Sequence, residues 1–383
     1  IGVQTDMATP ALARFVIGVV PADQLLGGEP NERNRSPRRP SRTAMALSPD
    51  GQRVVFSGMR GDAQQLYMRS LDRLDATPMA GTDNSDSPFF SPDGQWVGFW
   101  ASGELKKVPI DGGPAVTICK APAIYGASWG SNDMVVFARA GREGLWQGPV
   151  GGGAPRALTT VDMKKGEISH RLPQILPGGQ AVLFTIQRSA FGWDTAQIVV
   201  RSLVTGEQTM LIEGGADARY VATGHLVWAR SGTLMAAPFD LAHLKITGGA
   251  VGIVDGVMQA VNAPNLNIDT GAAQFSVSGS GALVYVPGGM FPDRENSLVW
   301  VDRAGAIQPL AVPPRAYLSP RLSPDGQRLA LFAQGTDLNV WVYDLGRGTL
   351  TRFTTEGQNG FPVWTPDGQR LAFERSSAGG GTS

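Results

Sequence analysis

The sequence predicts an all-β fold, a β-propeller of four-stranded antiparallel blades. Three observations predict it. A Ser/Thr-Pro-Asp-Gly phrase flanked by apolar residues recurs along the chain, a second phrase of alternating apolar residues follows several copies, and the strong copies are spaced by 42 or 43 residues. The 50 glycines and 27 prolines in 383 residues supply the many turns that this fold needs.

The first phrase is a hairpin signal, seen in FFSPDGQWVGFW at residues 89–100. Proline presets φ at the second turn position, aspartate hydrogen-bonds the backbone just beyond it, and glycine takes the left-handed position. Aromatic and β-branched flanks suit the pleated surface of a strand. Strong copies begin at Ser48, Ser91, Ser323 and Thr365, and each predicts a tight β-hairpin.

Weaker copies fill the interval between the strong ones, with small or polar residues turning between two apolar segments. They lie around Gly130, Pro177, Thr223 and Ser278, which makes eight turns that we call anchors. The second phrase predicts another hairpin after several anchors. It reads QLYMRSLD, ELKKVPIDGG, LWQGPVGGG, QIVVRSLVTG and NVWVYDLGRG.

Each unit therefore holds about four strands in roughly 40 to 45 residues, the content of one propeller blade. Seven complete units predict a seven-bladed ring, and the hairpin after Thr365 leaves open a ring of eight blades with an incomplete last blade. The strand-like run Ala13–Val20 is the segment that could complete the last blade. We expect residues 1–43 to be an N-terminal strand and a basic Pro/Arg-rich linker, and residues 44–383 to be a propeller cut within its last blade.

Charge and cysteine content exclude several classes of function. The 33 basic and 33 acidic residues balance, which argues against a nucleic-acid partner. The exception is residues 31–42 with five arginines, which we interpret as a solvated linker, the alternative being a tether for phosphate or lipid headgroups. The single cysteine, Cys119, is expected in the core. No apolar run reaches the length of a membrane span.

The sequence offers few candidates for catalysis, and we expect no cofactor and no metal site. Ser128 sits in a G-x-S-x-G match, GASWG, but a strand-like segment follows where a nucleophile elbow needs a helix. The anchor aspartates are expected to cap their own turns instead of sharing a calcium ion. His170, with Glu167 and Arg171 nearby, supplies only two members of a triad.

A binding face follows from the propeller geometry. The loops that enter the innermost strands lie on one face around the central channel, so residues just before each anchor converge although they are far apart in sequence. Their arginines could bind a carboxylate, a phosphate or an acidic peptide, or could instead pair with neighbouring acidic residues and hold the blades together. The candidates are Asp86, Tyr125, His170, Arg171, Asp217, Arg219, Tyr317, Arg321 and Asn359.

The anchors, followed by LY or VWVYDL and a Gly turn, resemble the WD-repeat-like propeller repeats of the TolB family. Four longer phrases are similar to the propeller region that follows the kinase domain in bacterial eukaryotic-like serine/threonine protein kinases. These phrases are SPFFSPDGQWVGFW, GEISHRLPQILPGGQAVLFT, DARYVATGHLVWAR and LVWVDRAG. The likeness extends from about Ala44 onward, and it implies the fold more specifically than the function.

This resemblance implies a sensor or interaction propeller displayed outside the cytoplasmic membrane, which binds a protein, a peptide or a small envelope ligand at its channel mouth. The chain has no Gly-rich loop followed by a strand lysine, no His-Arg-Asp and no Asp-Phe-Gly, so we do not expect it to be an enzyme. Two alternatives stay open. One is the substrate-gating propeller of a prolyl-oligopeptidase-like hydrolase, and the other is a freestanding TolB-like envelope scaffold.

Overall fold

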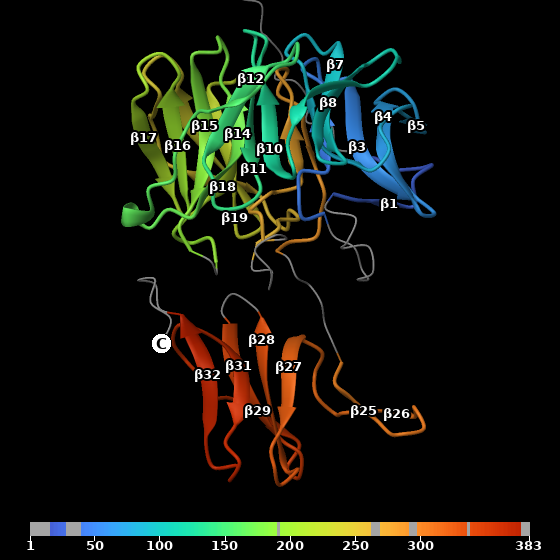
Figure 1. Ribbon diagram of the computed structural model, residues 1–383, viewed down its shortest axis with the longest axis vertical. Helices are drawn as coiled ribbons and strands as arrows, with labels where there is room; N and C mark the ends of the chain where they lie inside the picture. The colour runs from blue at the N-terminus through green and yellow to red at the C-terminus, as the bar shows by residue number, and fades with distance from the viewer. Residues whose placement is uncertain are drawn as a thin grey trace, which may run out of the picture.

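The computed structural model describes residues 16–27, 40–189, 192–261, 269–290, 297–334 and 338–376. Within these ranges the regular structure is β-strand, apart from one 3-10 turn at Met163–Lys165 (Figure 1). Every pair of strands is antiparallel, and sheets of four or five strands recur along the chain. The predicted all-β class with four-stranded antiparallel sheets is therefore confirmed.

Successive stretches of the chain form successive sheets. The first sheet contains β1 (Gln24–Leu25), β2 (Met45–Leu47), β3 (Arg53–Arg60), β4 (Ala63–Ser70) and β5 (Thr77–Pro78). The second contains β6 (Ser85–Phe90), β7 (Trp96–Ala101), β8 (Glu104–Pro109) and β9 (Val116–Lys120). The third contains β10 (Ile124–Trp129), β11 (Met134–Arg139), β12 (Leu145–Pro149) and β13 (Arg156–Ala157).

Three further sheets complete this part of the molecule. The fourth contains β14 (Ser169–Ile175), β15 (Ala181–Gln187), β16 (Gln197–Ser202) and β17 (Gln208–Glu213). The fifth contains β18 (Ala216–Val221), β19 (His225–Arg230), β20 (Thr233–Asp240), β21 (Lys245–Ile246) and β22 (Val251–Val254). The sixth is the hairpin of β23 (Phe275–Val277) and β24 (Leu283–Tyr285).

All eight anchors form the predicted hairpin turns. In each one the N–H of the fourth turn residue donates to the carbonyl of the first at 2.8–3.2 Å. We call that first residue position 0. The eight residues at position 0 are Ser48, Ser91, Gly130, Leu176, Val221, Ser278, Ser323 and Thr365.

The anchor aspartates cap their own turns, as predicted. Asp93 accepts from the Ser91 hydroxyl at 2.5 Å and from the Gln95 N–H at 3.0 Å. The same two contacts hold the pKa of Asp93 below its ordinary value. The three other strong copies repeat this arrangement at Asp50, Asp325 and Asp367.

Strand β15 shows why the sheets stack side by side. All seven of its residues are buried, since both faces of the sheet are covered. Leu183 packs in one direction into a cluster with Trp228 of the fifth sheet. Phe184 packs in the opposite direction into a cluster with Val136 of the third sheet. Consecutive residues of a strand point to opposite faces, so one strand serves two inter-sheet cores.

Six sheets make a closed circuit around an axis. Their innermost strands are β2, β6, β10, β14, β18 and β23, which follow one another in that order. The circuit closes between the last and the first, because the Leu47 N–H donates to the Ser276 hydroxyl at 2.9 Å and the Ala44 N–H donates to the Gln274 side chain at 2.8 Å. Phe275 in turn packs into the core of the fifth sheet.

The remaining strands form a second group, drawn in orange and red in Figure 1. It contains the hairpin β25 (Val299–Val301) and β26 (Ile307–Pro309), then the four-stranded sheet β27 (Ala316–Leu322), β28 (Arg328–Gln334), β29 (Leu338–Asp344) and β30 (Thr349–Arg352). The hairpin β31 (Gln358–Trp364) and β32 (Leu371–Ser376) follows. Here the anchors at Ser323 and Thr365 again join the first two strands of a unit.

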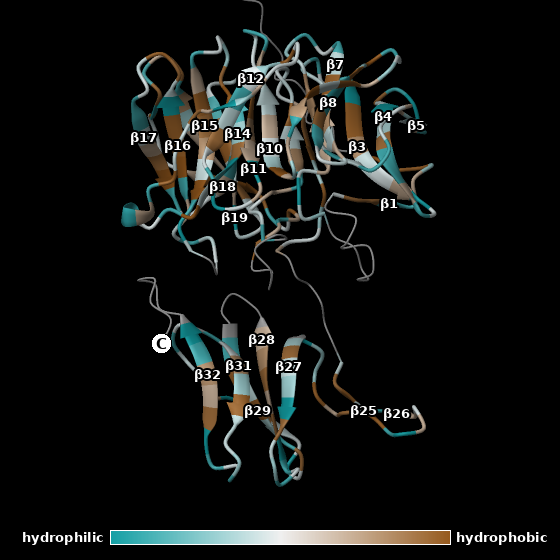
Figure 2. Cartoon of the chain, viewed as in Figure 1, coloured by the Kyte–Doolittle hydropathy of each residue, from teal (hydrophilic) through white to brown (hydrophobic). Residues whose placement is uncertain are grey.

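The expected number of seven blades in one ring is not confirmed, since the hairpins from Ser48 to Ser278 already close a circuit of six sheets. The N-terminal segment also differs from the expectation. Residues 1–15 lie outside the described residues, but Ile17 and Val19 pack against the first sheet instead of the terminal hairpin. Figure 2 shows apolar residues concentrated in the strands and hydrophilic ones in the connecting turns.

A bulge recurs in the innermost strands, four residues before position 0. The backbone there adopts a positive φ, for example 54° at Ser87, 53° at Leu172 and 57° at Asp217. The strand pairing shifts register at the same place. A bulge turns the side chains around it to new directions. The positions before the bulge therefore point into the centre of the ring, and those after it line the anchor side of the channel.

Candidate functional site

The structure brings six of the nine predicted site residues together around the channel of the six-sheet circuit. They are Asp86, Tyr125, His170, Arg171, Asp217 and Arg219, on the innermost strands β6, β10, β14 and β18. The first five are at most 2% exposed. Tyr317, Arg321 and Asn359 instead belong to β27 and β31 in the second group.

Arg171 lies at the centre of the buried set. Its guanidinium stacks on the Tyr125 ring at 4.0 Å from the ring centroid and donates to the Asp269 carbonyl at 2.8 Å. The Asp269 carboxylate in turn accepts from the Trp193 indole at 2.7 Å. Burial lowers the pKa of Arg171 to about 10. Arg171 thus joins strand β14 to the segment that precedes β23, and it is enclosed by protein.

Arg42 is a channel residue that the sequence did not indicate. We expected it in a solvated linker, but its side chain is buried, 3.9 Å from the Asp86 carboxylate and 5.7 Å from the ring centroids of Trp100 and Tyr125. The Arg42 carbonyl accepts from the Gln274 amide at 2.8 Å. The interpretation as a solvated linker is therefore wrong for Arg42. The four other arginines of that segment lie outside the described residues.

Asp217 and Arg219 form an ion pair at 2.5 Å across the bulge of β18. Asp217 is buried and also accepts from the Ala273 N–H at 2.9 Å. Burial raises the pKa of Asp217, against the opposing effect of Arg219. Arg219 reaches the channel, where its guanidinium donates to the Pro173 carbonyl at 3.5 Å. This pair fits the structural alternative, in which charged residues hold neighbouring strands together.

His170 is part of a buried hydrogen-bond chain. Its Nε2 lies 3.0 Å from the Glu167 carboxylate, and its Nδ1 lies 2.6 Å from the Thr159 hydroxyl. That hydroxyl also accepts from the Leu145 N–H, and Thr354 accepts from the Val340 N–H in the same way in the second group. Thr159 therefore has a structural role common to the repeat. Burial lowers the pKa of His170.

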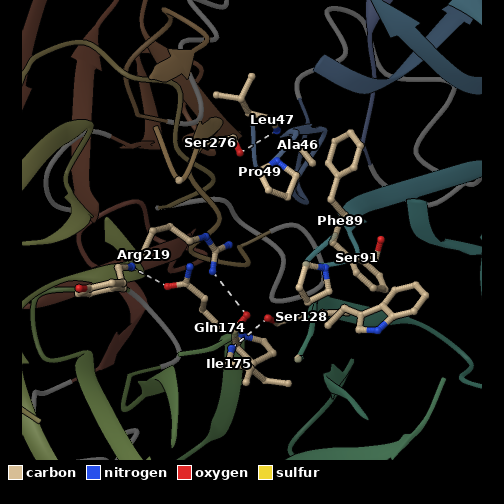
Figure 3. Close-up of a pocket in the computed structure, with 18 of the residues that line it drawn as sticks. Ala46, Leu47, Pro49, Phe89, Ser91, Ser128, Gln174, Ile175, Arg219 and Ser276 are labelled. Atoms are coloured by element: carbon tan, nitrogen blue, oxygen red, sulfur yellow. Dashed lines mark hydrogen bonds between the residues drawn. The ribbon is translucent and has the colours of Figure 1, made fainter. Parts of the chain in front are cut away.

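The open part of the channel is a cavity of about 510 Å³ on the anchor side (Figure 3). Every one of the six innermost strands contributes to its wall, mainly through the positions from −3 to 0. Apolar side chains such as Phe89, Trp129 and Ile175 make most of the lining. Arg219 is the only charged side chain in the wall among the described residues. Sequence reasoning missed most of this cavity because the predicted residues lie mainly at or before the bulge, and of them only Arg219 is in the lining.

A repeated hydrogen bond joins neighbouring innermost strands around the cavity. The side chain at position −2 of one strand accepts the backbone N–H at position −1 of the next strand. Ser128 accepts from Ile175 at 2.9 Å, Gln174 accepts from Tyr220 at 2.6 Å, and Ser276 accepts from Leu47 at 2.9 Å (Figure 3). We call these three contacts the strand caps.

The strand caps explain the serine of the G-x-S-x-G match. Ser128 lies within β10, and the strand β11 follows it. Its hydroxyl is a cap acceptor with no strained strand-to-helix turn around it. Cys119 is buried as expected, and burial raises the pKa of its thiol. Across the described part of the chain, no group of three or more His, Cys, Asp or Glu side chains is placed to hold a metal ion.

No helix of the described residues is long and apolar enough to cross a membrane. No protein-family model matches the chain, and no curated protein matches it. The similarities that exist are to solved structures, each with low sequence identity, and they concern the fold.

One of them is the crystal structure of TolB from Acinetobacter baumannii, with 14% identity and a TM-score of 0.42 over 51% of this chain and 50% of that one. This chain thus aligns with about half the length of TolB. The β-propeller domain of Cps50 (Swd1) from Myceliophteria thermophila has 12% identity and a TM-score of 0.41, covering 91% and 97%. Puromycin hydrolase has 14% identity and a TM-score of 0.41, covering 87% and 58%. The chain is thus similar in fold to TolB and to WD-repeat-like propeller domains.

Proposed function

We propose that this chain is a non-catalytic binding propeller whose ligand enters the axial cavity. The observation that supports this most is the cavity itself, a space of about 510 Å³ where six strands from distant parts of the sequence converge. Mostly apolar walls with a few placed polar groups are typical of ligand sites. The expected ligand is a protein segment, a peptide or a small envelope molecule.

The absence of catalysis is part of this proposal and is supported by what the candidate catalytic groups do. Ser128 accepts a strand cap, and His170 is enclosed between Glu167 and Thr159. Each of these side chains has a structural partner at the position where chemistry would need a substrate. A purified chain tested against esterase and peptidase substrates should therefore show no turnover above that of a Ser128→Ala variant.

We also propose that the chain belongs to a longer bacterial serine/threonine kinase and lies outside the cytoplasmic membrane. The four phrases that resemble the propeller region of such kinases support this. The gene sequence tests it directly. A kinase domain and a membrane span encoded before Ile1 would support the proposal, whereas an α/β-hydrolase domain encoded after Ser383 would replace it with the substrate-gating alternative.

Site-specific photocrosslinking in cells tests axial binding. Ala222 lines the rim of the cavity and is exposed, whereas Val204 is 74% exposed in the turn between β16 and β17. A benzoylphenylalanine at position 222 should give a defined adduct that the same probe at position 204 does not give. Adducts of equal yield from both positions, or none from position 222, would remove the axial cavity as the binding site.

A further inference from the structure

We infer that the axial cavity binds a carboxylate carried on an apolar body, and that the carboxylate lies against the first three sheets. This inference rests on the proposed axial binding and assigns the chemical class of the ligand. The strand caps carry the argument, since they satisfy the inward N–H groups of β2, β14 and β18 and leave open those of other strands, including the neighbours β6 and β10.

The innermost strands direct the N–H at position −1 away from their own sheet. In β6, for example, the Ser91 N–H donates to the Trp96 carbonyl of β7. Successive N–H groups of a strand point to opposite sides, so the Phe90 N–H points away from β7 and toward the axis. Trp129 follows the same rule, since the Gly130 N–H donates to the Met134 carbonyl. An N–H in this position needs an acceptor from the preceding strand or from a ligand.

Three of the six innermost strands lack such a cap, namely β6, β10 and β23. On β23 the N–H at position −1 belongs to Val277, and the side chain that would cap it is Arg219, which has no acceptor atom. The position −2 residue that would cap the Phe90 N–H is Ala46 on β2, and the one that would cap the Trp129 N–H is Phe89 on β6. Neither side chain has an acceptor atom. The three caps are made at Leu47 on β2, Ile175 on β14 and Tyr220 on β18. The uncapped N–H groups of Phe90 and Trp129 lie on neighbouring strands, β6 and β10.

Unpartnered hydroxyls lie on the same side. The side-chain oxygens of Ser87 and Thr43 are buried without a hydrogen-bond partner, and both residues line the cavity. Ser87 is only 2% exposed. Buried polar groups are normally paired, so two unpaired hydroxyls on residues that line the cavity are candidate contacts for a ligand. We call Thr43, Ser87 and the N–H groups of Phe90 and Trp129 the donor arc.

The donor arc selects a ligand that presents acceptor atoms, and the described wall has no carboxylate that would repel an anion. A backbone N–H can only donate, so the ligand must present oxygen lone pairs. No carboxylate lines the cavity among the described residues, and the single charged lining residue, Arg219, is paired with Asp217. A carboxylate accepts several N–H and O–H bonds at once. Phe89, Pro88 and Trp129 provide apolar surface for the rest of the ligand.

Isothermal titration with matched probes tests this assignment. Hexanoate is compared with hexanamide, and acetyl-Ala-Ala-Leu with a free C-terminus is compared with its C-terminal amide. We expect each carboxylate to bind at least tenfold more tightly than its amide, because a hydrogen bond to a charged group is stronger than one to a neutral group. Binding of hexanoate indicates a free carboxylate ligand, and binding of the peptide alone indicates a chain terminus.

The variant Ala46→Ser places on β2 the hydroxyl that Ser128 and Ser276 carry at the same position of their strands. It should cap the Phe90 N–H, weaken carboxylate binding about tenfold and raise the unfolding midpoint. Ser128→Ala makes the converse change, since it uncaps the Ile175 N–H in the cavity wall, and should lower the midpoint without weakening carboxylate binding. Ser87→Ala provides a second test without added volume.

Two results would overturn the inference: equal affinities for acid and amide, or carboxylate affinity that neither Ala46→Ser nor Ser87→Ala changes. These results are distinguishable from failure of the proposed function. If the crosslink at position 222 persists while no carboxylate probe binds, the cavity binds a ligand of another class. If that crosslink is absent, axial binding itself is wrong.

Discussion

The amide oxygen of Gln174 accepts the backbone N–H of Tyr220 at 2.6 Å, and so fixes the innermost strand of one sheet to that of the next. Gln174→Leu keeps the size of the side chain but leaves this N–H without its partner. We expect a loss of about 1 to 2 kcal/mol in the free energy of unfolding. Urea denaturation measures it, with Gln208→Leu on the exposed strand β17 as the control. Equal midpoints for the two variants would show that the cap adds nothing.

Arg42 and Asp86 provide the second prediction. Both side chains are buried, so Arg42→Met removes from the Asp86 carboxylate the cationic charge that lies 3.9 Å away. We expect destabilisation of about 3 kcal/mol or more. The double variant Arg42→Met with Asp86→Asn removes both charges and should recover part of that loss. Urea denaturation of the two variants gives the comparison, and no recovery in the double variant would mean that the charge of Asp86 is not the source of the loss.

Gly98 and Phe89 provide the third prediction. A Cβ at Gly98 would lie 2.2 Å from the ring of Phe89, far inside contact distance. Gly98→Ala should therefore destabilise the fold by about 3 kcal/mol, the upper range for overpacking. Adding Phe89→Leu should restore part of the stability, because the smaller side chain leaves room for the methyl group.

Gly252→Ala is the matched control for Gly98. Its added methyl would meet neighbouring atoms only at 3.6 Å and beyond, so the thermal midpoint should move little. If Gly98→Ala lowers the thermal midpoint as little as this control does, the Phe89 ring does not pack closely over β7.

His170 makes the stability depend on pH. Burial lowers the pKa of His170 in the folded chain, so the unfolded chain binds a proton near pH 6.5 while the folded chain stays neutral. Stability from this group is present above about pH 6.5 and falls as the pH drops from there toward the lower pKa of the folded state. The slope reaches at most about 1.4 kcal/mol per pH unit, the value for one proton.

Urea unfolding between pH 7 and pH 5 checks this prediction. The variant His170→Gln keeps a polar side chain but removes the titration, so its free energy of unfolding should change less steeply with pH. The same slope in the variant and the parent chain would assign the pH dependence to other groups.

Local chemistry explains which parts of the fold were predictable. The Ser-Pro-Asp-Gly turns were predictable, because the serine, the aspartate and the N–H groups that follow them form their hydrogen bonds within the turn itself. The weaker anchors at Gly130 and Val221 were also predictable from apolar segments on both sides. The number of sheets in the ring was not, since it depends on how whole sheets pack against each other.

The site was predicted in part. The convergence of Asp86, Tyr125 and Arg171 followed from the repeat, but their burial did not. The bulge decides which side chains line the cavity, and it is occupied by residues as different as Ser87, Leu172 and Asp217. No residue type marks it, and the same positive φ recurs at Ser319 and Phe361 in the second group. Arg42 was missed because its sequence neighbours are polar and basic.

Because of the strand caps, single substitutions can change how many open hydrogen-bond donors the channel wall presents. The side chain at position −2 of each innermost strand decides whether the inward-facing N–H of the next strand is hydrogen-bonded by the protein or is open to a ligand. The backbone follows the same course in either case. A serine or glutamine at this position stabilises the ring, whereas an alanine or phenylalanine leaves the N–H available to a ligand. Substitutions at these few positions therefore change which ligands related propellers bind, with a small loss in the free energy of unfolding.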